Sequence, residues 1–328
     1  MSDFYQGRAV LVTGGCGFIG SHLVDALLRS GAHVRVLGRY SSSGSWGNLE
    51  RYRNSDVDLD VRLGTVTDPS FVASSVAAQD VVFHLAALIG IPYSYVAPEH
   101  YVQTNVTGTL NVLEAVRRHE TPRLVHTSTS ECFGSAQSVP MSELHPISAQ
   151  SPYAATKVAA DQLVGSYWRS FGTPGVTVRP FNTFGPRQTL RAVVPTVIAQ
   201  ALAGPRVRLG SVTPLRDLNP VQNTVNAMML AGSVPGIEGE LFVVGSGVER
   251  SVGDVVEAVA VLLGRPLEIE TDDRRVRPEA SEVDRLLCDY GKARDRLGYE
   301  PAVSFNEALR ETIEWMRDMR VDTVGYAV

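Results

Sequence analysis

The feature that most constrains how this chain can fold is a strand signal that runs directly into a glycine-rich turn and then into a helix signal. Residues 9–13 (Ala-Val-Leu-Val-Thr) form a short apolar run, and Gly14, Gly17 and Gly20 follow it. Apolar residues then recur with helical spacing over residues 19–28. Glycines allow the tight turn between the two elements, so we predict a strand–turn–helix unit that opens a parallel sheet.

The same alternation continues through roughly the first 180 residues. Further strands are predicted at residues 34–37, 81–85, 124–128 and 176–179. Long helices are predicted at residues 101–118 and 153–171. This alternation predicts an α/β fold, a doubly wound parallel sheet of the Rossmann type with helices on both faces. Ligands of such sheets bind beyond the carboxyl ends of the strands, where we expect Glu131 and Asn182.

Beyond residue 180 the pattern is less regular, and proline, glycine and arginine become frequent. A helix signal at residues 221–231 and a strand signal at 241–245 indicate a return to the sheet. Two more helices are predicted at residues 251–263 and 305–319. They indicate a smaller C-terminal α/β region.

The composition excludes several classes of protein. Of the 328 residues, 44% are apolar and 20% are charged, which is ordinary for a soluble globular protein. The formal net charge of −5 argues against a nucleic-acid partner. No apolar run approaches the length of a membrane span, and the first strand begins too early to leave room for a cleavable signal. We therefore predict a cytoplasmic protein with no nucleic-acid or membrane partner.

The sequence predicts no metal site. Cys16, Cys132 and Cys288 are widely spaced and form no paired metal or redox motif. The seven histidines lack the pairing with a nearby glutamate that hydrolytic zinc needs. Cys132 directly follows Glu131, and we interpret it as a small buried side chain at the end of a strand.

The glycine turn has the position and the chemistry of a dinucleotide site. Gly14, Gly17 and Gly20 have G-x-x-G-x-x-G spacing between a first strand and a helix. Such glycines let the backbone approach a pyrophosphate, whose charge the helix N-terminus attracts. We therefore predict a tightly bound NAD or NADP, with Phe18 and Ile19 also in contact with it.

The end of the second strand bears on the choice between the two dinucleotides. An acidic residue there would hold the ribose hydroxyls of NAD, but this chain has Gly38 and Arg39. Arg39 is either a partner for the 2′-phosphate of NADP or a solvated loop residue. Thr65 stands where many such enzymes carry an Asp that contacts adenine. Together these residues favour NADP.

Four side chains between positions 129 and 157 have the chemistry of a catalytic site. Tyr153 and Lys157 lie four residues apart, on one face of a predicted helix. A phenol titrates near about pH 10 in water, and a neighbouring cation together with the positive end of a nicotinamide lowers its pKa, so tyrosinate becomes a usable base. Glu131 adds an acid/base group two residues beyond the hydroxyl of Thr129. Tyr and Lys indicate oxidation of a substrate, and the carboxylate indicates a further step.

Together these residues resemble the extended short-chain dehydrogenase/reductase family of nucleotide-sugar enzymes. The likeness runs in order through motifs at residues 14–20, 84–87, 104–109, 151–157, 179–187 and 245–247. It implies cofactor contacts at Gly14, Gly17, Phe18, Ile19, Gly20, Arg39, Leu85, Ala86, Ala87, Asn105, Tyr153, Lys157 and Pro180. It implies that the diphosphate of a nucleotide sugar binds at Asn182, Arg187, Arg216 and Arg277. Any one of these arginines could instead be solvated or bridge two parts of the chain.

Within that family the chain looks most like nucleotide-sugar 4,6-dehydratases, especially those of legionaminic-acid pathways. The closer likeness lies at residues 88–94 and 277–283, and simple 4-epimerases usually lack the carboxylate at position 131. The resemblance implies catalytic roles for Thr129, Ser130, Glu131, Tyr153 and Lys157. Many dehydratases carry Asp where this chain has Ser130, so the group that protonates the departing hydroxyl stays open. A substrate like UDP-N-acetylglucosamine is implied, with GDP- and dTDP-sugars as alternatives.

Two other functions stay open on the sequence. One is a nucleotide-sugar decarboxylase or 4-epimerase that acts on a uronate, because such decarboxylases share the Ser-Thr-Ser-Glu motif of residues 128–131. A non-catalytic dinucleotide sensor is a more distant alternative, because such proteins commonly lose the Tyr or the Lys that this chain keeps. The helices at 101–118 and 153–171 resemble the pair that forms a dimer interface in the family, which implies a homodimer.

The domain division follows from the same resemblance. We predict a dinucleotide-binding domain of residues 1–180 plus about 218–245. Residues 181–217 plus 246–328, again with approximate bounds, are predicted to bind the sugar nucleotide.

Overall fold

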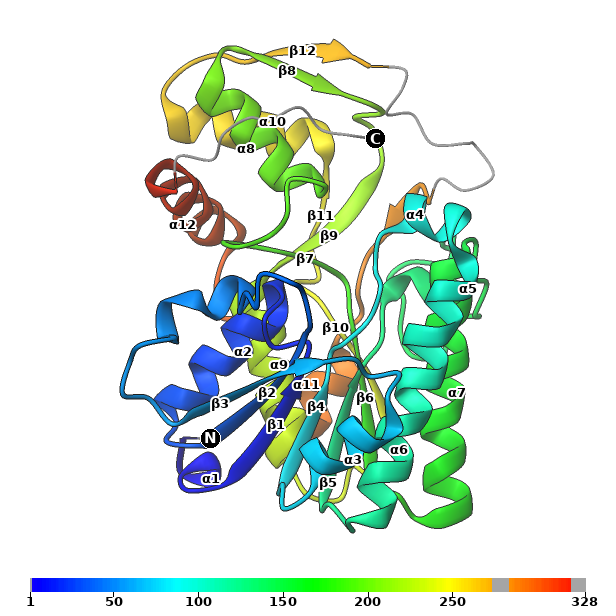
Figure 1. Ribbon diagram of the computed structural model, residues 1–328. Helices are drawn as coiled ribbons and strands as arrows, with labels where there is room; N and C mark the ends of the chain where they lie inside the picture. Colours follow the sequence, from blue (N-terminus) through cyan, green and yellow to red (C-terminus); the bar gives the residue numbers. More distant parts are fainter. Residues whose placement is uncertain (1, 273–282, 320–328) are drawn as a thin grey trace.

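Seven strands form one parallel sheet in the order β10–β6–β5–β4–β1–β2–β3 (Figure 1). The computed structural model describes residues 2–272 and 283–319. The strands are β1 (Ala9–Thr13), β2 (His33–Arg39), β3 (Leu59–Gly64), β4 (Val81–His84), β5 (Arg123–Thr127), β6 (Gly175–Pro180) and β10 (Leu241–Val244). Every neighbouring pair is parallel. The doubly wound Rossmann-type fold predicted from the sequence is confirmed.

Helices cover both faces of this sheet. Successive residues of a strand point to opposite faces, so the apolar strands place buried side chains on both of them. In β1, Val10 and Val12 belong to one buried core and Leu11 belongs to the other. The first core is covered by α2 (Phe18–Arg29), α9 (Val221–Ser233) and α11 (Gly291–Leu297). The second is covered by α3 (Pro69–Val76), α6 (Gly108–Arg118) and α7 (Pro152–Phe171) (Figure 1). Burial on both faces explains why the strands read as continuous apolar runs.

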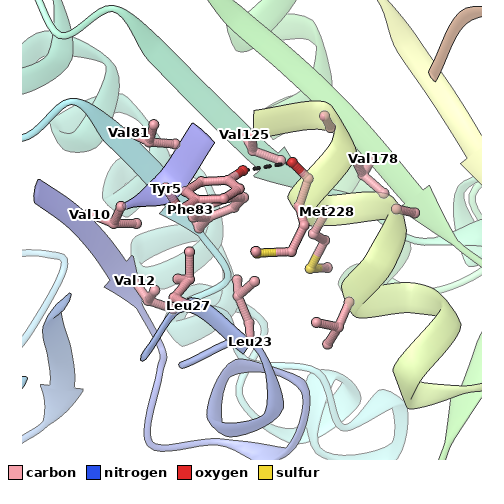
Figure 2. Close-up of a cluster of buried hydrophobic side chains, with 14 of the residues drawn as sticks. Tyr5, Val10, Val12, Leu23, Leu27, Val81, Phe83, Val125, Val178 and Met228 are labelled. Atoms are coloured by element: carbon pink, nitrogen blue, oxygen red, sulfur yellow. Dashed lines mark hydrogen bonds between the residues drawn. The ribbon is translucent and has the colours of Figure 1, made fainter. Parts of the chain in front are cut away.

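The start of the chain is anchored in the first core. Tyr5, in the short helix α1 (Ser2–Tyr5), is fully buried beside Phe83 (Figure 2). Its hydroxyl donates to the carbonyl oxygen of Met229 in α9 at 2.6 Å. The hydrogen bond satisfies the one polar atom of a large apolar side chain, so burial of the ring stabilises the fold without an unpaired donor.

The elements that follow β6, apart from α9, β10 and α11, lie above the carboxyl ends of the large sheet (Figure 1). One small sheet contains β7 (Asn182–Phe184), β9 (Leu215–Pro220), β11 (Glu249–Ser251) and β13 (Arg285–Leu286), and another pairs β8 (Arg206–Leu209) with β12 (Glu268–Thr271). Three helices pack with β8 around a separate core: α8 (Val193–Ala203), α10 (Val252–Leu263) and α12 (Phe305–Asp318). This placement leaves the ends of β4, β5 and β6 facing the second part of the chain.

The helix predicted at residues 101–118 is built from three segments. It consists of α5 (Pro98–Tyr101), the π-helical segment η2 (Val102–Thr107) and α6. The wider π turn contains Asn105, whose side chain is buried. Hydrophobic periodicity does not report a π segment, since one widened turn changes the spacing only locally.

Short helical elements complete the described structure. They are α4 (Ile91–Val96) and the 3₁₀ segments η1 (Gly47–Tyr52) and η3 (Ser130–Phe133). Among residues 2–272 and 283–319, no helix is both long and apolar enough to cross a membrane.

Candidate active site

The glycine turn forms a cradle that side chains would fill. Gly14 has a φ of +74°, and a Cβ placed there would lie 2.8 Å from the backbone nitrogen of Ala86. A Cβ at Gly20 would lie 2.4 Å from the carbonyl oxygen of Gly14. Gly17 is different, since its Cβ would meet only that same oxygen, at 3.2 Å. The turn is therefore tightly packed at Gly14 and Gly20 and open at Gly17, which fits the approach of a pyrophosphate.

Helix α2 begins at this open position. Gly17 is its N-cap and supplies no side-chain hydrogen bond, and Phe18 and Ile19 lie half-buried in the first turn. The first amide groups of a helix lack partners within the helix and carry a partial positive charge. The predicted contacts at Gly17, Phe18 and Ile19 therefore lie where a phosphate would be held by backbone donors.

The segment after β4 closes the cradle on its other side. Thr13 receives hydrogen bonds here: its carbonyl oxygen accepts from the Leu85 amide at 3.1 Å, and its hydroxyl accepts from the Ala86 amide at 3.2 Å. Ala87 follows, half-buried. Residues 85–87 are thus fixed against the turn at Gly14, as expected for a dinucleotide site.

Asn105 shapes this segment from behind. Its Oδ1 accepts from the Leu88 amide at 2.8 Å, and its Nδ2 donates to Leu88 O and to Thr156 Oγ1, both at 3.0 Å. Both amide hydrogens are therefore used within the protein. Asn105 ties the loop after β4 to α7, and a direct contact with the cofactor stays a prediction.

The ends of β2 and β3 lie at one edge of the cradle. Arg39 pairs with Gly64 in the sheet, and Thr65 follows directly. The Arg39 side chain is exposed and has no ion-pair partner among the residues that the structure describes. Its charge is therefore available to an anionic ligand at this edge.

Thr129, Ser130 and Glu131 follow the end of β5. Thr129 is the N-cap of η3, and its hydroxyl accepts a hydrogen bond from the Glu131 amide at 3.3 Å. This cap turns the chain sharply, so Glu131 stays half-buried while Ser130 is buried. The local motif Thr-x-Glu thus places the hydroxyl and the carboxylate on the same short turn.

Tyr153 and Lys157 lie on the first two turns of α7. Ser151 caps this helix by accepting from the Ala154 amide at 3.1 Å, and Pro152 occupies the first helical position, where it needs no donor. Tyr153 is 7% exposed and Lys157 is 4% exposed. The Lys157 ammonium donates to the carbonyl oxygen of Thr127 at 2.6 Å, so α7 is fastened to the end of β5.

The surroundings of Tyr153 act on its pKa in both directions. Burial raises the pKa of Tyr153 above its ordinary value, the hydrogen bond with the Thr129 side chain lowers it, and the charges of Glu131 and Asp161 raise it. The lowered pKa predicted from the sequence requires the nicotinamide beside the phenol and stays a prediction. The described side chains alone therefore keep the phenol protonated, because desolvation outweighs them. The same interactions show that Thr129, Glu131 and Tyr153 lie close together, and their catalytic roles stay predictions.

Among the predicted substrate residues, Asn182 lies at the expected place. It begins β7, just beyond the end of β6 at Pro180, and its buried Oδ1 has no hydrogen-bond partner among the described residues. A buried unpaired acceptor is costly unless a ligand or water uses it. Arg216, in β9, donates to the carbonyl oxygen of Leu215 at 3.0 Å. Arg277 lies outside the described residues.

Arg187 makes contacts that the sequence did not predict. It has a φ of +70°, and its guanidinium donates to Ser21 Oγ at 3.1 Å and to Asp25 Oδ2 at 2.7 Å, both in α2. His22 Nε2 lies 2.9 Å from the carbonyl oxygen of Pro186 in the same turn. These contacts clasp the turn at residues 185–187 to α2. Arg187 therefore bridges two parts of the chain, and its role as a phosphate ligand stays a prediction.

Asp25 is the centre of this clasp. Besides Arg187, it accepts hydrogen bonds from Arg51 and from the Tyr52 hydroxyl, the latter at 2.9 Å. We expect Asp25→Asn to lower the free energy of unfolding by about 2 kcal/mol, less than for a fully buried pair because Arg51 is partly exposed. Urea unfolding measures this change, with Asp58→Asn as control. Asp58 pairs with His33 on the surface, so an equal loss in that variant would contradict the prediction.

The comparison with known proteins decides the family. The family model described as GDP-mannose 4,6 dehydratase matches residues 11–312. The chain belongs to this family. Membership confirms the resemblance to extended short-chain dehydrogenases/reductases that act on nucleotide sugars, and relatives in the family include both dehydratases and epimerases.

Three relatives illustrate this range. A dTDP-glucose 4,6-dehydratase of Actinoplanes sp. is 31% identical over 95% of this chain and 98% of its own length. A UDP-glucose 4-epimerase of Mycolicibacterium smegmatis is 34% identical over 94% of this chain and 98% of its own. The crystal structure of DesIV, a dTDP-glucose 4,6-dehydratase from Streptomyces venezuelae with NAD bound, superimposes with a TM-score of 0.85 at 29% identity, covering 95% and 98% of the two chains.

The sequence did not indicate one aromatic neighbour of Tyr153. The ring of Tyr101 lies edge-on to Tyr153, with centroids 6.3 Å apart, and its hydroxyl donates to the carbonyl oxygen of Gly90 at 2.5 Å. Tyr93 of α4 packs on Tyr101 in turn, with centroids 6.2 Å apart. No motif marked Tyr101, because its role depends on how α4 and α5 fold over α7. Among the described residues, no group of His, Cys, Asp and Glu is placed to hold a metal ion.

Proposed function

We propose that this chain is a nucleotide-sugar 4,6-dehydratase, which converts an NDP-hexose to its 4-keto-6-deoxy product with loss of water. The observation that carries this proposal is the convergence of the Glu131 carboxylate with the Tyr153 phenol and the Thr129 side chain. A tyrosine and a lysine suffice to oxidise and reduce a sugar at one carbon. A carboxylate in the same place supplies the base that an elimination needs.

Each residue has a role that follows from its position. Tyr153 takes the proton of the sugar 4-hydroxyl, and Thr129 holds the same oxygen by a hydrogen bond. The ketone at C4 acidifies the proton on C5, which Glu131 removes and returns to C5 when the hydride is delivered to C6. Ser130, buried beside Glu131, relays a proton to the hydroxyl that leaves C6 as water.

A nicotinamide dinucleotide in the glycine cradle would accept a hydride from C4 and return it to C6, so the overall reaction is neutral in redox terms. The chain's own contribution is to keep the site ordered and dry. Lys157 and Asn105 fix the end of β5 and the loop after β4 against α7, and Tyr153 is buried at their junction. Water is thus limited around the phenol before proton transfer.

The proposed substrate is an NDP-hexose like UDP-N-acetylglucosamine. Asn182 supports a polar ligand beyond β6, and the charge of Arg216 in β9 suits a diphosphate. The test is mass spectrometry of the products formed from UDP-, GDP-, dTDP- and CDP-sugars. A product lighter by one water supports the dehydratase, whereas loss of carbon dioxide or an unchanged mass would refute it.

A second candidate is a nucleotide-sugar 4-epimerase. It is favoured by the epimerase of M. smegmatis, which matches this chain at 34% identity. An epimerase returns the hydride to C4 and has no use for a base at C5. An isomer of unchanged mass, with no solvent deuterium at C5, would select this function.

We propose that Arg39 directs the cradle towards NADP. Replacing Arg39 by Ala should weaken the binding of NADP about 10- to 100-fold, which corresponds to one charge-assisted hydrogen bond. The affinity for NAD should be unchanged. The measurement is titration of both nucleotides, together with identification of the nucleotide released on denaturation. Arg208→Ala is the control, because Arg208 pairs with Glu270 in β12, far along the chain from the cradle. Equal loss for NAD and NADP, or NAD alone in the released fraction of the native protein, would contradict the proposal.

We also propose that the chain works as two domains and as a homodimer. Residues 1–180 plus about 218–245 would hold the dinucleotide, and the remainder would hold the sugar nucleotide. The dimer would form through η2, α6 and α7. In α7, Val164 and Tyr167 are buried in the chain's own core, but Trp168 and Phe171 are exposed. A solution mass of twice 35.5 kDa supports the dimer, and a monomer would refute it.

A further inference from the structure

A buried polar cluster lies behind the proposed catalytic residues and takes no part in the mechanism above. Its centre is the Asp161 carboxylate, which accepts hydrogen bonds from Ser128 Oγ at 2.6 Å and from Arg179 Nη2 at 2.7 Å. His126 Nε2 lies 3.2 Å from the other carboxylate oxygen. All four side chains are less than a tenth exposed. Burying so many polar groups is costly, so their arrangement calls for a reason beyond packing.

The cluster joins the two segments that carry the catalytic side chains. Asp161 lies one helical turn after Lys157 in α7, and the two contact neighbouring positions at the end of β5. Lys157 donates to the carbonyl oxygen of Thr127, and Asp161 accepts from the hydroxyl of Ser128. Thr129 follows immediately. Two adjacent contacts thus fix the distance between the helix that carries Tyr153 and the turn that carries Glu131.

Asp161 is also the anionic neighbour of two buried cations. One is Arg179, which belongs to the cluster, and the other is Lys157, one helical turn before Asp161. Burial alone would raise the pKa of Asp161, but His126, Arg179 and Lys157 bring it down to about 2. Burial lowers the pKa of Lys157, and the charge of Asp161 is the largest influence that raises it again. Asp161 therefore opposes the loss of the Lys157 proton.

The histidines and the cysteine around the cluster are neutral near pH 7. Burial lowers the pKa of His126 to about 4 and holds the pKa of His84, stacked beside it on β4, well below its ordinary value. Burial also raises the pKa of Cys132, whose sulfur lies 3.9 Å from Asp161, to about 11. Tyr153 faces Glu131 from η3 and Tyr101 from α5, and besides burial the charges of Glu131 and Asp161 both raise its pKa.

We propose that Asp161 is a positioning residue for the reaction above: its carboxylate fastens the end of β5 to α7 and keeps the Lys157 ammonium charged next to Tyr153. The inference rests on the proposed function for its effect on turnover. Its effect on Lys157 is independent of any substrate. The effect of Asp161 on turnover and its effect on the charge of Lys157 can therefore be refuted separately.

The charge of Lys157 can be followed directly, because the chain contains only two lysines, Lys157 and Lys292. NMR of lysine-labelled protein would show two side-chain signals. In Asp161→Asn the Lys157 signal should titrate at lower pH than in the native protein, and in Asp161→Glu it should stay near the native position. Lys292 is half-buried, pairs with Glu240 and serves as an internal reference. A Lys157 titration that is unchanged in folded Asp161→Asn would overturn the inference.

Turnover gives the second readout. For Asp161→Asn we expect kcat to fall about 10- to 100-fold with KM for the sugar nucleotide unchanged, and the alkaline loss of activity to move to lower pH. The control is Glu238→Gln, which removes the partner of buried Arg123 at the opposite end of the same strand. That variant should lose stability but keep the native pH profile. A native kcat per folded molecule in Asp161→Asn would overturn the positioning role.

A milder variant covers the case in which Asp161→Asn does not fold. Ser128→Ala removes one hydrogen bond to Asp161 and no charge, so kcat should fall about tenfold with the Lys157 titration unchanged. A native kcat in this variant would overturn the positioning role. If the native protein converts no sugar nucleotide, the proposed function fails, and the Lys157 titration still decides the role of Asp161.

Discussion

Replacing Glu131 by Gln is expected to lower kcat by about 100-fold or more, since a positioned general base contributes a factor of this order. The amide has nearly the same size, and the Glu131 backbone amide keeps its hydrogen bond to Thr129, so the turn of η3 should remain. Binding of the sugar nucleotide should change little. The measurement is the initial rate of formation of the dehydrated product.

The place of the lost step can be found by isotope exchange. In deuterated water the native enzyme should give product with deuterium at C5, because Glu131 exchanges the proton that it removes. Glu131→Gln should give almost none. The control is Glu314→Gln, an exposed position in α12, which should behave like the native protein. Undiminished exchange in Glu131→Gln would assign the C5 proton to another group and refute the proposed role.

The fold could be predicted from the sequence because its signals are local. The apolar run at residues 9–13, the glycines after it and the next helix each reflect short-range sterics and burial, and β1, the turn and α2 occur as predicted. The convergence of Thr129, Glu131 and Tyr153 was also predictable. Parallel strands end at one edge of a sheet, so residues just beyond β5 meet the start of α7 there.

The features that the sequence did not indicate are contacts between segments that lie far apart in the chain. An arginine in the turn after β7 has many possible partners, and only the fold brings Asp25 of α2 to Arg187. Asp161 likewise reads as an ordinary polar position of a helix. Its neighbours are Ser128, just beyond β5, and Arg179, in β6, and the spacing of residues in the sequence does not indicate that they meet Asp161.

The electrostatics of Tyr153 were harder still to predict. Spacing places a lysine four residues away, but it does not report how deeply the phenol is buried. Burial raises the pKa of Tyr153, and this effect outweighs the hydrogen bond to Thr129. A pattern of residue types gives the sign of each interaction, whereas the balance among them depends on the packing of α5, α7 and η3.

That balance leads to the prediction with the largest expected effect, Tyr153→Phe. Loss of the phenol should lower kcat about 1,000-fold, within the range known for a general acid–base group. Because burial raises the pKa of Tyr153, the reactive tyrosinate is scarce at neutral pH. Its fraction grows as pH rises towards that pKa, so native kcat should increase with pH until Lys157 loses its proton, and the Phe variant should lose this increase.

The control variant is Tyr5→Phe, which removes a buried phenol hydroxyl outside the candidate active site. Tyr5 is also buried and burial raises its pKa, but it lies in α1, in the first core, and donates to Met229 O. Its loss should cost about 1 kcal/mol of stability and leave kcat and its pH dependence intact. If Tyr153→Phe kept a kcat within a few-fold of native, the base would have to be sought elsewhere. The half-buried Glu131 carboxylate, already close to the phenol, would then be the first group to test, since one carboxylate can serve both proton transfers only if they occur in sequence.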